Sequence, residues 1–169
     1  DADFISRNYD NARRLIEYYI EKRDAHGFIP PLPGVWLFID WHPIDRNGDV
    51  CVVQMLFYRS LCVMAELASL CRKSEDAARY RALATELGEK INATYWNSEL
   101  GAYVSTYREG EEVHEVRRHQ NYLSILFGLA DEKRTADILA SVLHNTDIPP
   151  LTTPFYKFFE YEVLCRCGF

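Results

Sequence analysis

The chain has 169 residues, of which 48% are hydrophobic and 14% aromatic, enough for one packed core, so residues 1–169 are treated as a single segment. Its formal net charge of -6 has the wrong sign for holding a phosphate backbone, and we expect no nucleic-acid partner. The apolar run from Val50 to Tyr58 ends at Arg59, far short of the roughly 20 residues that span a bilayer, and we expect no membrane partner.

The cysteines and histidines give no pattern typical of a metal site. Five cysteines make an odd number and form no CxxC pair, and His114 and His119 are one residue too far apart for an HExxH motif. We therefore expect no metal and no cofactor. Free cysteines favour a reducing compartment, and no signal-peptide pattern follows Asp1, but the compartment stays unassigned.

The first elements are an amphipathic helix and a proline-rich loop. In residues 4–22, apolar side chains recur at helical spacing between charged ones, which predicts an outer helix with one apolar stripe of Phe4, Ala12, Leu15, Ile16 and Tyr19. Residues 27–34 contain prolines and glycines that cannot continue a helix. They should form an extended loop that leads to Asp40-Trp41-His42.

Residues 50–71 are apolar on nearly every side, which predicts a buried, inner helix. We expect Asp45 and Asp49 to cap its start. Ser74 should cap the next helix, which is again an outer one because its apolar residues repeat at steps of three and four: Ala77, Tyr80, Ala84, Leu87 and Ile91.

The second half of the chain repeats this order. Residues 96–118 include glycines and the alternating segment 102–107, which predict a short hairpin or an irregular loop. An apolar inner helix should begin at His119, and an outer helix capped by Asp131 should follow it. A last buried helix should begin at Thr153-Pro154, with the proline in its first turn.

Alternating outer and inner helices predict an all-α fold of helical hairpins around a shared centre. A helical solenoid and a closed (α/α) toroid both have this order. A solenoid repeats at a fixed period, whereas the inner helices here begin near 50, 119 and 153, at intervals of about 69 and then 34 residues. The uneven spacing favours the toroid.

Short motifs follow one another along these elements. They are Phe38-Ile39-Asp40-Trp41 after the loop, Ala65-Glu66-Leu67-Ala68, Tyr95-Trp96-Asn97, His119-Gln120-Asn121-Tyr122-Leu123 and Thr153-Pro154-Phe155. In order and spacing, over about the whole chain, they resemble the six-hairpin catalytic domain of bacterial α-L-rhamnosidases.

That resemblance implies about half of an (α/α) six-hairpin toroid, a carbohydrate substrate, and inverting hydrolysis of terminal rhamnosides by two carboxylates. The motifs that carry the general acid and the general base in that family do not occur here, so no catalytic residue is assigned. The chain should then be the middle of a catalytic domain and inactive alone. It should associate through apolar edges with the remainder of the domain or with itself.

Five residues are candidates for substrate binding: Asp40, Trp41, His119, Asn121 and Tyr156. By resemblance, Asp40 binds sugar hydroxyls and Trp41 stacks on the ring, whereas the structural alternative is a capping Asp and a core Trp. A His or Asn at the start of a helix is more often a satisfied structural group, which is the alternative for His119 and Asn121, and core packing is favoured for Tyr156. Another toroidal sugar enzyme, such as a phosphorylase, and a helical-repeat interaction module are the alternative functions.

Overall fold

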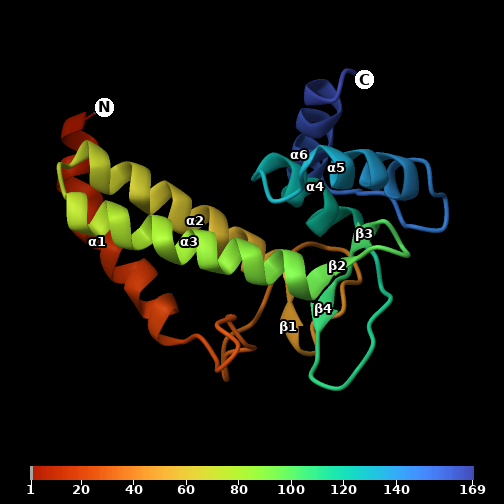
Figure 1. The fold of residues 1–169 in the computed structure, drawn as a ribbon, viewed down its shortest axis with the longest axis horizontal. Coiled ribbons are helices and arrows are strands. Elements are labelled where there is room, and N and C mark those ends of the chain that lie inside the picture. Colours follow the sequence, from red (N-terminus) through yellow and green to blue (C-terminus); the bar gives the residue numbers. More distant parts are fainter. Residues whose placement is uncertain (1) are drawn as a thin grey trace.

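The computed structural model describes residues 2–169, and helices joined by loops make up most of it (Figure 1). The helices are α1 (Ala2–Glu21), α2 (Cys51–Leu70), α3 (Ser74–Tyr95), α4 (Arg118–Leu126), α5 (Glu132–Ile138) with its π-helical continuation η1 (Leu139–Leu143), and α6 (Pro154–Arg166). The strands have two residues each: β1 (Asp49–Val50), β2 (Trp96–Asn97), β3 (Ala102–Tyr103) and β4 (Thr106–Tyr107). The prediction of an all-α fold built from helical hairpins is confirmed.

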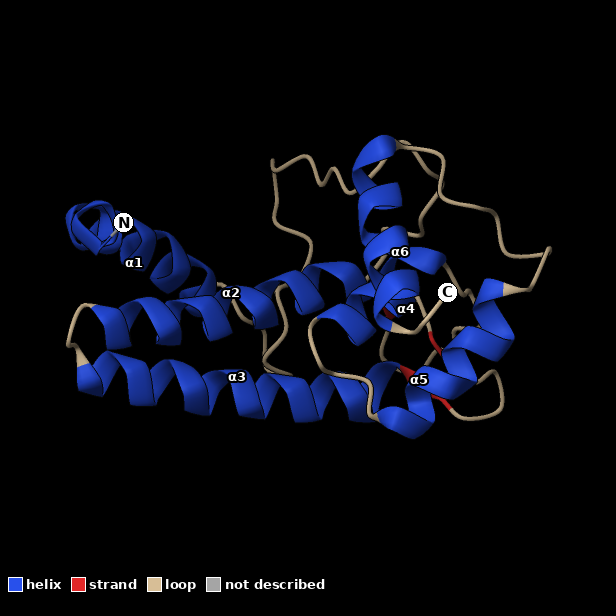
Figure 2. Cartoon of the chain, turned by 90° about the horizontal axis from the view of Figure 1, so that it is seen from above, coloured by secondary structure: helices blue, strands red, loops and turns tan. Residues whose placement is uncertain are grey.

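The hairpin of α2 and α3 forms the long body of the molecule (Figure 2). As predicted, α2 buries apolar side chains around most of its circumference, and α3 buries the single stripe that contains Ala77, Ala84 and Ile91. Gly88 of α3 allows the two helices to approach closely, because a Cβ atom there would lie 3.1 Å from the ring of Tyr58. Each fully buried aliphatic side chain in this hairpin contributes roughly 1.5–3 kcal/mol to folding.

The short strands hold residues 96–107 against the ends of the helices. Asp49 pairs with Tyr107 between β1 and β4, and Trp96 pairs with Tyr103 between β2 and β3. The alternating segment 102–107 therefore pairs with two other segments and does not form a hairpin of its own. Gly48 lets β1 approach β4, because it has a φ of +103° and a Cβ atom there would lie 2.4 Å from the carbonyl oxygen of Tyr107.

The inner helices contact one another in sequence. α4 packs against α2 on one side and against α6 on the other, and η1 covers α4. Outer and inner helices thus alternate as the sequence predicted. The loop before α2 carries Asp40 and Trp41, whereas His119 and Asn121 lie in the first turn of α4 and Tyr156 lies in the first turn of α6.

The last helix is less buried than predicted. In α6 the buried side chains are Tyr156, Glu160 and Val163, whereas Phe155 and Phe158 are 67% and 62% exposed. Both rings contact Phe159 on the same helix. Association of the chain through such apolar side chains stays a prediction.

The expected helix caps are only partly correct. Asp131 caps α5, because its Oδ1 accepts a hydrogen bond of 2.8 Å from the backbone N–H of Arg134. Asp45 and Asp49 do not cap α2, and Ser74 lies inside α3. Asp45 instead forms an ion pair of 2.7 Å with Arg108.

By length and composition alone, α2 is apolar enough to cross a membrane, with a mean hydropathy of 1.4 over its most apolar window. Half of that window is buried inside the fold, between α1, α3 and α4. A core helix has the same composition, so this feature is weak evidence for a membrane span.

Candidate functional site

The loop between α1 and α2 carries the first candidate residues and is fixed by a buried glutamine. The Oε1 atom of Gln54 accepts a hydrogen bond of 2.8 Å from the backbone N–H of Ile29, and its Nε2 donates one of 2.9 Å to the Ile29 carbonyl. Gln54 lies in the first turn of α2 and is fully buried. The Gln54 amide thus binds the start of the proline-rich segment to the inner helix α2. Asp40, further along the loop, is held by other contacts.

Asp40 and His119 form a buried pair. The Nε2 atom of His119 lies 2.8 Å from Oδ2 of Asp40, and the two side chains are only 1% and 3% exposed. The other carboxylate oxygen, Oδ1, accepts a hydrogen bond of 2.8 Å from the backbone N–H of Trp41. The pair links the loop before α2 to the first turn of α4.

The surroundings of the pair make the imidazole neutral and the carboxylate ionised. Burial lowers the pKa of His119 more than the neighbouring carboxylate raises it, so the ring is neutral and donates from Nε2. Burial alone would raise the pKa of Asp40, but the side chains of His119 and Thr153 and the Trp41 backbone N–H outweigh it and hold this pKa below its usual value. The site therefore contains an ionised carboxylate supported by a neutral imidazole.

Two further rings enclose His119. The ring of Tyr156, in the first turn of α6, meets it edge to face at 4.4 Å between centroids, and the ring of His42 lies 5.3 Å away on the loop. Burial raises the pKa of the Tyr156 hydroxyl, which stays protonated. The structure thus brings Asp40, His119 and Tyr156 together from three segments that precede or begin inner helices.

His42 is a residue of this site that sequence reasoning did not select. It is 8% exposed and contacts His119 with its ring. The sequence signal that could have identified His42 is its position two residues after Asp40, in the same loop. Sequence alone does not reveal that its ring reaches α4.

Trp41 is not a core residue, so the structural alternative for this position is wrong. Its side chain is 79% exposed and contacts Phe38 edge to face at 5.2 Å, and Phe38 contacts Trp36 at 5.1 Å. An exposed indole next to a fixed carboxylate offers a flat apolar surface beside a hydrogen-bond acceptor.

Asn121 has a structural role in the fold. It is fully buried, its Oδ1 accepts a hydrogen bond of 2.8 Å from the Tyr103 backbone N–H, and its Nδ2 donates to the carbonyls of Tyr103 and Arg117. The side chain therefore joins β3 to the start of α4. These contacts support the structural alternative for Asn121, and its place in a sugar pocket stays a prediction.

A second buried polar cluster holds α4 and α6 together near the site. Glu160 lies 3.6 Å from the guanidinium of Arg118 and accepts a hydrogen bond of 3.3 Å from the Tyr122 hydroxyl, while Lys157 forms an ion pair with its other oxygen. Arg118 also donates to backbone carbonyls of the segment after η1. The burial of this carboxylate is thus compensated by paired charges.

The site is a buried cluster of hydrogen-bonded and aromatic side chains. Across residues 2–169, no three His, Cys, Asp or Glu side chains converge in a way that could hold a metal ion. Each oxygen of Asp40 already accepts one hydrogen bond, but a carboxylate has about four acceptor positions in all. Acceptor positions of Asp40 therefore stay unused, while only 3% of its side chain is exposed.

Helical hairpins in which inner and outer helices alternate define an (α/α) hairpin domain. Residues 1–148 match the family described as the bacterial alpha-L-rhamnosidase 6 hairpin glycosidase domain. The chain belongs to this family, and the resemblance inferred from its motifs is confirmed.

Solved structures have the same fold. A GH78 family rhamnosidase of Bacillus sp. GL1 is 25% identical with a TM-score of 0.86, and the match covers 99% of this chain and 18% of that one. A rhamnosidase from Klebsiella oxytoca with rhamnose bound is 23% identical with a TM-score of 0.78, covering 96% of this chain and 30% of that one. The chain thus spans less than a third of either structure. No curated protein gives a significant match.

Proposed function

We propose that this chain is the sugar-binding part of a glycoside hydrolase domain that removes terminal α-L-rhamnose with inversion. The observation that carries the proposal is the ionised carboxylate of Asp40, fixed by His119 and followed directly by the exposed indole of Trp41. Membership of the glycosidase family and the solved rhamnosidases of the same fold support it.

The two side chains suit the two kinds of surface on a 6-deoxy sugar. Ring hydroxyls donate hydrogen bonds to the Asp40 carboxylate, which is 3% exposed in this chain and must become accessible when the sugar binds. The face with C–H and methyl groups packs on the Trp41 indole. His119 and Tyr156 are positioning residues, because their ring contacts hold the carboxylate and its donor in place. Asp40 has a lowered pKa, so it accepts hydrogen bonds and does not serve as the protonated acid.

The hydrolytic step needs two carboxyl groups about 6.5–9.5 Å apart. One donates its proton to the glycosidic oxygen as the bond from that oxygen to the anomeric carbon breaks. The other takes a proton from the water that attacks the opposite face of the same carbon. We assign neither group to this chain and place both in the rest of the domain.

Hydrolysis of 4-nitrophenyl α-L-rhamnopyranoside tests the proposal. The 169-residue chain alone should give no rate above the blank, whereas a polypeptide that carries the complete domain should release nitrophenol and, by NMR, first form the β-anomer of rhamnose. Retention of configuration would contradict the mechanism. Hydrolysis by the 169-residue chain would contradict the assignment of the carboxyl pair.

Variants of the complete domain test the site itself. Asp40→Asn should lower kcat/KM roughly tenfold to a hundredfold, because a neutral amide accepts weaker hydrogen bonds than a carboxylate. Asp10→Asn is the control, since the Asp10 side chain is 75% exposed on α1 and contacts only Arg13 there. Equal kcat/KM values for Asp40→Asn and Asp10→Asn would show that Asp40 does not bind the substrate.

We also propose that the protein works in a reducing compartment. All five cysteines are free in the fold, which supports this proposal. Alkylation of denatured protein from its native source, followed by peptide mass spectrometry, should find all five cysteines of residues 1–169 as free thiols. Recovery of disulfide-linked protein would argue for an oxidising compartment.

A further inference from the structure

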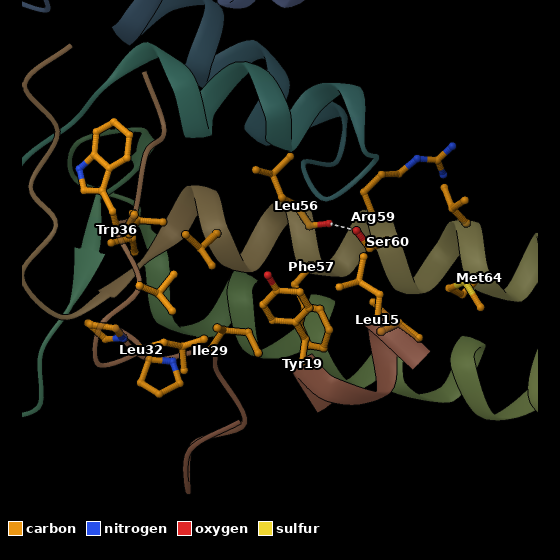
Figure 3. Close-up of a pocket in the computed structure, with 18 of the residues that line it drawn as sticks. Leu15, Tyr19, Ile29, Leu32, Trp36, Leu56, Phe57, Arg59, Ser60 and Met64 are labelled. Atoms are coloured by element: carbon orange, nitrogen blue, oxygen red, sulfur yellow. Dashed lines mark hydrogen bonds between the residues drawn. The ribbon is translucent and has the colours of Figure 1, made fainter. Parts of the chain in front are cut away.

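An apolar groove with a volume of about 820 Å³ lies between α1, α2 and the proline-rich loop (Figure 3). Most of the side chains that line it are apolar, and neither Asp40 nor His119 is among them. A sugar would find few hydrogen-bond partners in this groove. The polar groups that a sugar needs therefore have to be sought around Asp40.

Thr153 begins α6 without capping it. Its backbone is extended, with a φ of -85° and a ψ of 141°, and its carbonyl accepts a hydrogen bond of 3.0 Å from the backbone N–H of Lys157. A threonine hydroxyl at such a position usually accepts a hydrogen bond from the first turn of the helix. The Thr153 side chain makes no such bond to the described residues of α6. Its hydroxyl is therefore available to another partner.

The start of α6 places this hydroxyl next to Asp40. Tyr156, one turn further along α6, contacts the ring of His119 at 4.4 Å between centroids, and His119 bonds to Asp40. The Thr153 side chain lies near enough to Asp40 to lower the pKa of its carboxyl group. Asp40 has acceptor positions beyond the two hydrogen bonds that it accepts from His119 and the Trp41 backbone. A hydroxyl group and a carboxylate thus border the same space.

Two polar atoms of this cluster are buried without a partner. Oγ1 of Thr153 is covered from solvent and has no hydrogen-bond partner among residues 2–169. The same holds for Nδ1 of His119, whose side chain is 1% exposed and bonds to Asp40 through Nε2. Buried polar atoms nearly always have a partner, because an unpaired one costs free energy. Two such atoms beside one carboxylate indicate that a group from outside the chain completes the cluster.

We propose that Thr153 is a ligand-binding residue, and that its Oγ1 and the carboxylate of Asp40 together hold one hydroxyl group of the sugar. The sugar hydroxyl donates a hydrogen bond to Asp40 and accepts one from the Thr153 hydroxyl, so both functions of the group are used. This inference rests on the proposed function and adds a residue to the same site.

The start of α6 is also a side from which a ligand can approach. Thr153 is partly buried, and its neighbours Thr152 and Pro154 are exposed. The carboxylate of Asp40 is 3% exposed and must become accessible when the sugar binds. Opening on this side would leave the Thr153 hydroxyl at the edge of the pocket.

Binding of L-rhamnose to a polypeptide that carries the complete domain tests the proposal. Calorimetry measures the Kd, so the readout does not depend on hydrolysis. Thr153→Val keeps the shape of the side chain and removes its hydroxyl, and the Kd should rise roughly tenfold. Thr153→Ser keeps the hydroxyl and should bind within about threefold of wild type. Thr152→Val is the matched control, since Thr152 is exposed, and it should bind as wild type does.

Methyl α-L-rhamnoside and its 2-, 3- and 4-deoxy analogues identify the hydroxyl that Thr153 contacts. The analogue that lacks this hydroxyl should bind equally to wild type and Thr153→Val. The other two analogues should keep the roughly tenfold difference between the two proteins.

Thr153→Asp separates ligand binding from helix capping. Aspartate is among the best N-cap residues, so a capping role predicts an unchanged Kd and an unfolding temperature at least as high as that of wild type. The proposed contact predicts a loss of affinity at least as large as for Thr153→Val. The reason is that a second carboxylate beside Asp40 repels the first and cannot donate a hydrogen bond.

Equal Kd values for wild type and Thr153→Val would overturn the proposal, because the buried hydroxyl would then bind water only. A tenfold difference that persists with all three deoxy analogues would also overturn it, since the variant would then act through the fold. If Asp40→Asn weakens binding and Thr153→Val does not, the proposed function stands without this contact. A wild-type domain that binds no L-rhamnose would contradict both.

Discussion

The imidazole of His119 donates a hydrogen bond of 2.8 Å to the carboxylate of Asp40, a residue 79 positions earlier in the chain. One partner lies on an irregular loop and the other in the first turn of α4, so the bond fixes the loop to the inner helices. Since both side chains are almost inaccessible, water cannot replace either partner when the other is removed.

We expect His119→Phe to destabilise the fold by about 1.5–3 kcal/mol at pH 7, because it keeps the ring and leaves the buried carboxylate without its donor. Urea unfolding measures the change. His114→Phe is the control, since its side chain is 60% exposed, and it should change the free energy of unfolding by less than about 0.5 kcal/mol. Similar losses in the two variants would contradict a specific role for the pair.

The effect of His119→Phe should depend on pH. The pKa of Asp40 is lowered in the folded state, so its ionised form contributes stability that is present above its unfolded pKa near 3.8 and lost as the pH falls through the folded value. The difference between wild type and His119→Phe should therefore shrink in acid. A difference that stays constant down to pH 3 would show that lost ring packing, not the carboxylate, causes it.

Asn121→Ala should cost about 2–4 kcal/mol, because it leaves the backbone N–H and carbonyl of Tyr103 and the carbonyl of Arg117 without the side-chain amide. Thermal unfolding followed by circular dichroism measures this loss. Asn11→Ala, on the exposed face of α1, should have almost no effect. If Asn121→Ala leaves the stability almost unchanged, the side chain has no important structural role, and a ligand-binding role for Asn121 is favoured.

Asp49 should give the protein a pH dependence of the opposite sign. Burial and the neighbouring carboxylate of Asp24 raise the pKa of Asp49 to about 6. Its protonated form is favoured by folding, so this contribution is fully present below the unfolded pKa near 3.8 and is lost as the pH rises to about 6. The free energy of unfolding that is lost between these two pKa values has an upper limit of about 3 kcal/mol.

Asp49→Asn should remove this dependence, because an amide keeps the shape and carries no charge. Its backbone carbonyl, which accepts hydrogen bonds from Tyr95 and Thr106, is unchanged. Urea midpoints from pH 4 to pH 7.5 should fall less steeply for the variant than for wild type. Parallel curves would mean that Asp49 titrates as in the unfolded chain.

The helices were predictable from sequence because the periodicity that defines them is local. The stripe of Ala77, Ala84 and Ile91 identifies the buried face of the outer helix of the first hairpin without knowledge of any contact. Capping was less predictable, since a distant arginine competes for the side chain: Arg108 binds Asp45, 63 residues away. An aspartate before a helix therefore has several possible partners, and only the fold selects one.

The site was partly predictable for the same reason. Asp40 lies in the loop before the inner helix α2, and His119 and Tyr156 lie in the first turns of the inner helices α4 and α6. Alternating inner and outer helices predict that these three segments lie close together. The direction of each side chain depends on contacts with other segments. Asn121 is two residues after His119, yet it faces the backbone of β3, and His42 reaches the site although Trp41 points to solvent.

Trp41→Ala should separate ligand binding from stability. The indole is 79% exposed, so its removal should change the free energy of unfolding by less than about 0.5 kcal/mol. In a polypeptide that carries the complete domain, KM for 4-nitrophenyl α-L-rhamnopyranoside should rise roughly tenfold, because the sugar loses its stacking surface. Phe169→Ala, which removes a ring that is 66% exposed at the far end of α6, should leave KM unchanged. An unchanged KM in Trp41→Ala would show that Trp41 is covered by another part of the domain, and the sugar would then have to contact the carboxylate of Asp40 from a different side.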